Sequence, residues 1–171
     1  MDISHVDVAG GHAIATQANV LIVLHRQQST AQKVERAHAE ATKLFRAHPE
    51  GIGLLIVLEA NARPPDDGAL AAVTHWMRHD TTGVRARVRV HEGTGFRAAF
   101  FRSVMLTLHR LGRPKSPDHV SPTVQDGATR LASELATSSV GCPTASELIR
   151  TVEALRVELN SLAKGRTNPR P

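Results

Sequence analysis

Aromatic residues are scarce in this sequence: there is no tyrosine, one tryptophan and four phenylalanines among 171 residues. Proteins that grip single-stranded nucleic acid do so by stacking bases on aromatic rings. All five rings fall in segments that the patterns below predict to be helical, most of them on apolar stripes. The composition therefore argues against recognition by stacking.

Cysteine is scarcer still, with Cys142 as its one representative. A single thiol excludes an internal disulfide, a CxxC redox pair and a thiolate zinc site. Residues 1–5 include an acid where a secretory signal carries base, and the longest apolar run, Val20–Leu24, has the length of a strand and not of a membrane span. We expect a cytoplasmic location.

Positive charge is in modest excess, 21 lysines and arginines against 16 acids. This balance permits an anionic partner without requiring one. Part of the excess is concentrated in residues 84–90, where apolar residues alternate with Arg85, Arg87 and Arg89. Alternation puts the three arginines on one face of a strand, which we expect to face solvent, acids of a neighbouring helix or a protein partner. Nucleic acid is disfavoured because no aromatic residues or recognition helix accompany the stripe.

Strands and helices alternate along the rest of the chain. Residues 12–15 and 19–25 predict a hairpin, residues 52–58 a strand buried on both faces, and residues 119–121 a short strand. Helices are predicted at 30–48, from 66 to about 79, from 96 to about 111, and from 121 or 123 to about 136. Ser29–Gln32 has the pattern of a capping box at the start of the first helix.

A further helix is predicted at residues 144–165. Thr144–Glu147 forms a second capping box, and the apolar residues that follow it are spaced alternately three and four apart. This seam consists of Ala145, Leu148, Val152, Leu155, Leu159 and Leu162. It either packs on its own domain or a partner subunit's domain, or self-associates. A linker at 139–143 precedes the helix, and a disordered tail at 166–171 follows it.

The resulting fold class is α/β: a mixed, mostly parallel sheet with an N-terminal hairpin, helical crossovers and an extra C-terminal helix. We expect residues 1–138 to form one domain, and from about residue 6 to residue 138 the element order resembles that of STAS domains, the fold of sulfate-transporter tails and anti-sigma-factor antagonists. The strand 52–58, the loop into Asp66 and the strand–turn–helix 84–97 carry the resemblance. Antagonists have a phosphorylatable serine where residues 61–68 of this chain contain no hydroxyl, so the resemblance does not extend to a phosphoswitch.

Two weaker patterns suggest ligand sites. Gly93, Thr94 and Gly95 lead into a helix that carries Arg97, so backbone N–H groups and a guanidinium could bind an anion there. His75 and His79 have the four-residue spacing of paired metal ligands, but Trp76 stands where a metalloprotease has its glutamate. We assign no catalytic residue, metal or cofactor.

These patterns favour a non-enzymatic regulatory module that binds proteins and forms a homo-oligomer. Its candidate surfaces are the arginine stripe and the seam from Leu148 to Leu162. The alternatives are a small-molecule or anion-binding protein that uses the Gly93–Arg97 turn, and an enzyme accessory protein.

Overall fold

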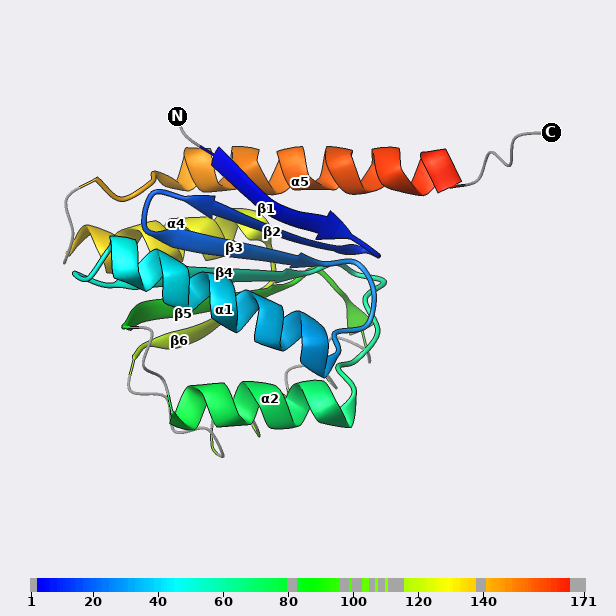
Figure 1. The fold of residues 1–171 in the computed structure, drawn as a ribbon, viewed down its shortest axis with the longest axis horizontal. Coiled ribbons are helices and arrows are strands. Elements are labelled where there is room, and N and C mark those ends of the chain that lie inside the picture. The colour runs from blue at the N-terminus through cyan, green and yellow to red at the C-terminus, as the bar shows by residue number, and fades with distance from the viewer. Residues whose placement is uncertain are drawn as a thin grey trace.

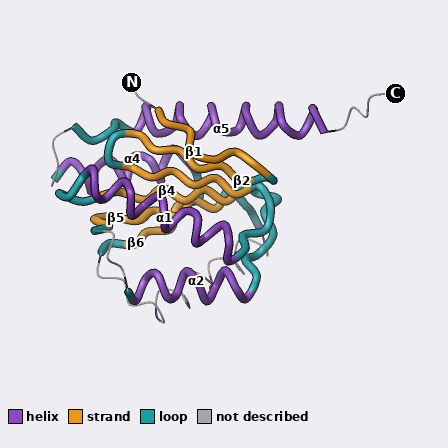
Figure 2. The backbone as a smooth tube through the Cα atoms, viewed as in Figure 1, coloured by secondary structure: helices purple, strands orange, loops and turns teal. Residues whose placement is uncertain are grey.

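The computed structural model describes residues 3–79, 83–95, 116–137 and 141–166, together with positions 99, 103, 104, 107 and 110. These residues form one six-stranded mixed sheet with helices on both faces (Figures 1 and 2). The predicted α/β class is confirmed. None of the helices in these segments is long and apolar enough to cross a membrane.

The strands follow one another in the sheet in chain order. They are β1 (Ile3–Ala9), β2 (His12–Gln17), β3 (Val20–His25), β4 (Ile52–Leu58), β5 (Val84–His91) and β6 (Asp118–Ser121). The first three pair antiparallel, and β3 to β6 pair parallel. The predicted hairpin is confirmed as β2–β3. The sequence did not predict β1, because the shift of register between His5 and Asp7 interrupts its alternation.

In the described part of the chain, two helices cover each face of the sheet. α1 (Ala31–Ala47) and α2 (Asp67–Arg78) lie on one face, while α4 (Val124–Ala136) and α5 (Ala145–Arg166) lie on the other (Figure 1). The two faces have separate apolar cores because successive residues of each strand point in opposite directions. We call them the α1–α2 face and the α4–α5 face.

The helix starts follow local capping chemistry with one exception. The Asp66 carboxylate accepts a hydrogen bond from the Ala69 amide at 2.7 Å, and the Thr123 hydroxyl accepts one from the Asp126 amide at 3.1 Å. The capping box at Ser29–Gln32 is wrong: Thr30 is the N-cap of α1 and makes no side-chain cap bond. Ser29 is instead buried, and its carbonyl accepts a hydrogen bond from the Asp66 amide.

The capping box of α5 is confirmed, since the Thr144 amide donates to the Glu147 carboxylate at 2.8 Å. Its seam is not a free surface. Leu148, Val152, Leu155 and Leu159 are buried against the sheet and α4, so α5 belongs to the same core as the preceding domain. Only the last seam residue, Leu162, is exposed, at 46%. Residues 139 and 140 of the predicted linker and 167–171 of the predicted tail lie outside the described part of the chain, whereas Arg166, also assigned to the tail, is the last residue of α5.

The arginine stripe is also corrected. Arg85 is exposed, but Arg87 and Arg89 are only 3% and 4% exposed. The alternation placed all three on one face, as expected, but β5 is an interior strand, and Arg87 and Arg89 contact Trp76 and Met77 of α2. The helix predicted from Phe96 to about Leu111 falls largely on positions outside the described residues.

Candidate functional site

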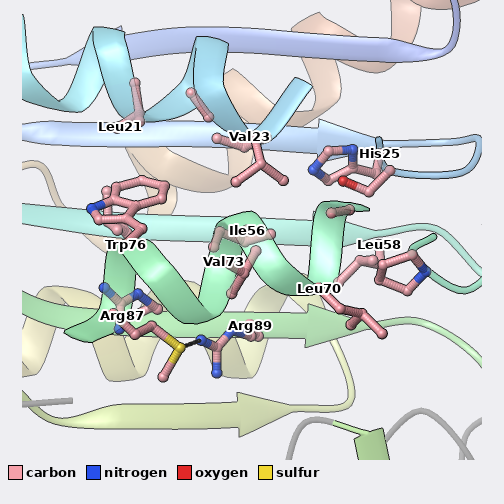
Figure 3. Close-up of a pocket in the computed structure, with 17 residues that line it drawn as sticks. Leu21, Val23, His25, Ile56, Leu58, Leu70, Val73, Trp76, Arg87 and Arg89 are labelled. Carbon is pink, nitrogen blue, oxygen red and sulfur yellow. Dashed lines mark hydrogen bonds between the residues drawn. The ribbon is translucent and has the colours of Figure 1, made fainter. Parts of the chain in front are cut away.

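A cavity of about 80 Å³ lies between the sheet and helices α1 and α2 (Figure 3). Its floor consists of side chains from β3, β4 and β5, and its walls come from the two helices. Most of the lining is aliphatic, including Leu21, Val23, Leu54, Ile56, Val34 and Val73. The cavity is concave and mostly apolar, as sites for small ligands in proteins commonly are.

The position of α2 explains the cavity. This helix packs mainly against α1 and stands away from the strands, so its longer side chains must bridge the gap to the sheet (Figure 1). Trp76 and Met77 do so at one end and Leu70 at the other (Figure 3). Ala69, directly before Leu70, is fully buried and lines the cavity with only a methyl group. The void is therefore a consequence of where large and small residues fall along α2.

His25 lies at the end of the cavity near Leu58 and Leu70 (Figure 3). It ends β3 and faces His12 across the β2–β3 pair, with ring centroids 4.7 Å apart. Burial lowers the pKa of His25 to about 3, and the nearby His12 and Lys33 charges act in the same direction. Burial also lowers the pKa of His12 to about 4, helped by Lys33 and opposed by Asp7. Both imidazoles are therefore neutral at pH 7.

Arg87 and Arg89 line the opposite end of the cavity, near Trp76 (Figure 3). The Arg87 guanidinium carbon is 6.0 Å from the centroid of the Trp76 ring. Arg89 donates to both carboxylate oxygens of Asp118, at 2.8 and 2.6 Å, and to the Met77 sulfur at 3.5 Å. Because the Asp118 side chain is only 1% exposed, this is a buried ion pair, in which one guanidinium nitrogen donates to both carboxylate oxygens.

The carboxyl ends of the parallel strands, where open α/β sheets usually bind ligands, carry a network of charges instead. Arg26 donates to Glu59 at 2.7 Å, and this bond raises the pKa of Arg26. From α5, Arg156 contacts Glu59 at 3.3 Å and also pairs with Glu92. These ion pairs tie α5 to the ends of β3, β4 and β5.

The residues of the predicted anion site are only partly described. The Gly93 amide donates to Nδ1 of His91 at 3.3 Å, and Gly95 has a φ of 69°, a left-handed conformation that favours glycine. Thr94 is exposed at this turn. Arg97 lies outside the described residues, so the anion site stays a prediction.

The two histidines predicted as metal ligands lie close together, but the described residues place no third ligand beside them. The His75 and His79 rings are 4.6 Å apart, and both residues are exposed. Within the described ranges, no group of three or more His, Cys, Asp and Glu side chains could hold a metal ion. The pairing follows from helical spacing alone.

Sequence reasoning did not single out His25 or the cavity. The available signal was a pair of histidines, His12 and His25, at the outer ends of two apolar strands that a short turn joins. Comparison with family models, curated proteins and solved structures finds no match for this chain. Its function is therefore argued from geometry.

Proposed function

We propose that this chain is a non-enzymatic regulatory module of STAS-like architecture that binds a small apolar molecule between its sheet and helices α1 and α2. The antiparallel start and parallel continuation of the sheet support the architecture. The cavity of about 80 Å³ carries the proposal of ligand binding. Of the residues offered as protein-contact surfaces, most are buried within the chain itself.

The size and lining of the cavity favour an apolar occupant. A water molecule needs roughly 10–15 Å³ and two or more polar partners, so an aliphatic space of this size is poorly suited to water. An empty space deprives the side chains around it of dispersion contacts, which a small apolar molecule would restore. Cavities of about 150 Å³ bind benzene. The smaller space here fits a ligand of a few heavy atoms.

A filling substitution tests this proposal. Ala69→Leu adds bulk from α2 into the cavity, and Ala71→Leu makes the same change at an exposed position of the same helix. We expect 1-chlorobutane, a small apolar probe, to stabilise the wild type and Ala71→Leu saturably, by about 1.4 kcal/mol at ten times its dissociation constant. Thermal denaturation of Ala69→Leu should not respond to the probe. Equal stabilisation of all three proteins, or of none, would contradict the proposal.

Self-association is a second candidate, and the exposure of Leu162 favours it. The C-terminal end of α5 extends past the ends of the strands (Figure 1), and Leu162, which continues the buried seam beside the turn between β1 and β2, is 46% exposed. Val157 is also exposed but lies about 140° around the helix from Leu162. If the seam end joins two copies, light scattering should find a dimer for the wild type and Val157→Lys but a monomer for Leu162→Lys. A monomeric wild type ends this candidate.

A further inference from the structure

On the α1–α2 face, we assign a role in ligand binding to one ring nitrogen of His25. The side chain is 6% exposed and lines the cavity (Figure 3). Its Nδ1 atom is buried and has no hydrogen-bond partner among the described residues. The contact with His12 is a tilted contact between the two rings, and it gives Nδ1 of His25 no hydrogen bond. A buried polar atom in this condition is costly, and in native structures it usually meets a water or a ligand.

Of the two arginines at the other end of the cavity, Arg89 is held by an ion pair. Arg89 is paired with Asp118 and Met77, and Arg87 lies against Trp76. We place the hydroxyl of the ligand at His25, whose ring nitrogen can donate or accept, because the guanidiniums at the other end can only donate. The aliphatic side chains between the two ends accept only hydrocarbon.

The protonation of His25 restricts the chemistry of that ligand. Burial holds its pKa near 3, so at neutral pH the ring carries no charge and offers no ion pair to a carboxylate. An ammonium group would lose its hydration on entering the cavity, and it would lie near the positive charges of Lys33 and the arginines. A neutral imidazole nitrogen is a donor in one tautomer and an acceptor in the other, and a hydroxyl can satisfy both because it donates and accepts.

We infer that the cavity binds a small uncharged alcohol, whose hydroxyl pairs with Nδ1 of His25 and whose hydrocarbon part lies between the sheet and α2. This inference rests on the proposed function, because it names the ligand class of the same cavity.

Four probes with one carbon chain test the inference on the full chain: 1-butanol, 1-chlorobutane, butyrate and butylammonium. Two readouts are needed, the dissociation constant of each probe and the ¹⁵N chemical shift of His25 Nδ1. We expect 1-butanol to move the Nδ1 signal and 1-chlorobutane to leave it in place. The ratio of the 1-chlorobutane to the 1-butanol dissociation constant should fall at least tenfold in His25→Leu and stay unchanged in His12→Leu, which alters the neighbouring ring outside the cavity lining.

The outcomes separate the two proposals. If both uncharged probes bind and their ratio is the same in His25→Leu, the cavity is a ligand site but its pairing with His25 is wrong. Tighter binding of butyrate than of 1-butanol would also overturn the inference, because it would assign recognition to the arginines. If no probe binds to the wild type, the proposed function fails as well. The Nδ1 signal gives a result with the wild type alone, so the inference remains testable if His25→Leu does not fold.

Discussion

The two faces of the sheet differ in how closely their helices approach. On the α4–α5 face, α4 crosses β5 at Gly127, where an added Cβ would lie 2.5 Å from a methyl group of Val90. On the α1–α2 face, α2 stands away from the strands and leaves a cavity lined in part by His25, Arg87 and Arg89. Alternate residues of the same strand, β5, build both surfaces. We call the α4–α5 face the close-packed face and the α1–α2 face the open face. We infer that the close-packed face provides stability and that the open face provides the capacity to bind.

The largest expected effect comes from breaking the ion pair on the open face. Arg89→Met leaves Asp118 buried without its two hydrogen bonds from the guanidinium, so the free energy of unfolding should fall by about 3–5 kcal/mol. The double variant Arg89→Met/Asp118→Leu should be less destabilised than Arg89→Met, because it removes both charges. Urea denaturation measures both values. A loss below about 1 kcal/mol in the single variant would show that the open face does not depend on this pair.

The second largest effect is expected from acid, which should lower the stability of the folded chain through two histidines on the open face. Above pH 6.5 both histidines are neutral in the folded and unfolded chains, so they do not affect the pH dependence of stability. Below pH 6.5 the unfolded chain binds protons that folded His12 and His25, with pKa values of about 4 and 3, do not. Stability should fall through this window, by about 3 kcal/mol or more at pH 4. Asp7 opposes the shift of His12, and Lys33 adds to both shifts.

Urea denaturation between pH 7.5 and pH 4 checks this prediction. The control is His12→Leu/His25→Leu, in which the carboxylates still titrate but the two histidines are gone. As the pH falls, the wild type should lose more stability than the double variant. Parallel curves for the two proteins would mean that the histidines do not resist protonation in the folded chain.

The smallest expected effect concerns the close-packed face. Gly127→Ala forces one methyl group against Val90, which costs about 1–3 kcal/mol, while the gain in helix propensity returns up to about 1 kcal/mol. The net loss should be about 1 kcal/mol. Ala69→Leu adds more atoms to the open face and should still change the stability of the unliganded protein less. Thermal denaturation compares the two, and a larger loss for Ala69→Leu would reverse the assignment of the faces.

Local signals in the sequence predicted much of this fold. Thr144 caps its helix as expected, and the helix start left open between residues 121 and 123 falls at Thr123, because a cap depends on residues within one turn. The apolar run Ile52–Leu58 predicted a strand covered on both sides, which β4 is. β1 escaped prediction because its bulge breaks the period of two.

The candidate site depended on contacts that no local pattern contains. Alternation assigned Arg87 and Arg89 to one face, but their burial follows from the position of α2, and the neutralisation of Arg89 follows from Asp118 on another strand. Likewise, the spacing of the α5 seam left open whether the helix packs in its own chain. In the structure α5 packs in its own chain, because it covers the apolar surface of β1, β2 and β3. His25 became noteworthy only beside His12 and the cavity.

The packing of α5 has a consequence for how the chain folds. This helix covers strands from the opposite end of the sequence, and its Thr151 hydroxyl donates to the Gln17 side chain, 134 positions away, at 2.7 Å. The apolar underside of β2 and β3 therefore stays exposed until residues 145–159 have been synthesised. Contacts that join such distant segments slow folding, because the intervening chain must be ordered before they form. The early strands are thus the segment most open to aggregation during synthesis, and completion of the core awaits the last helix.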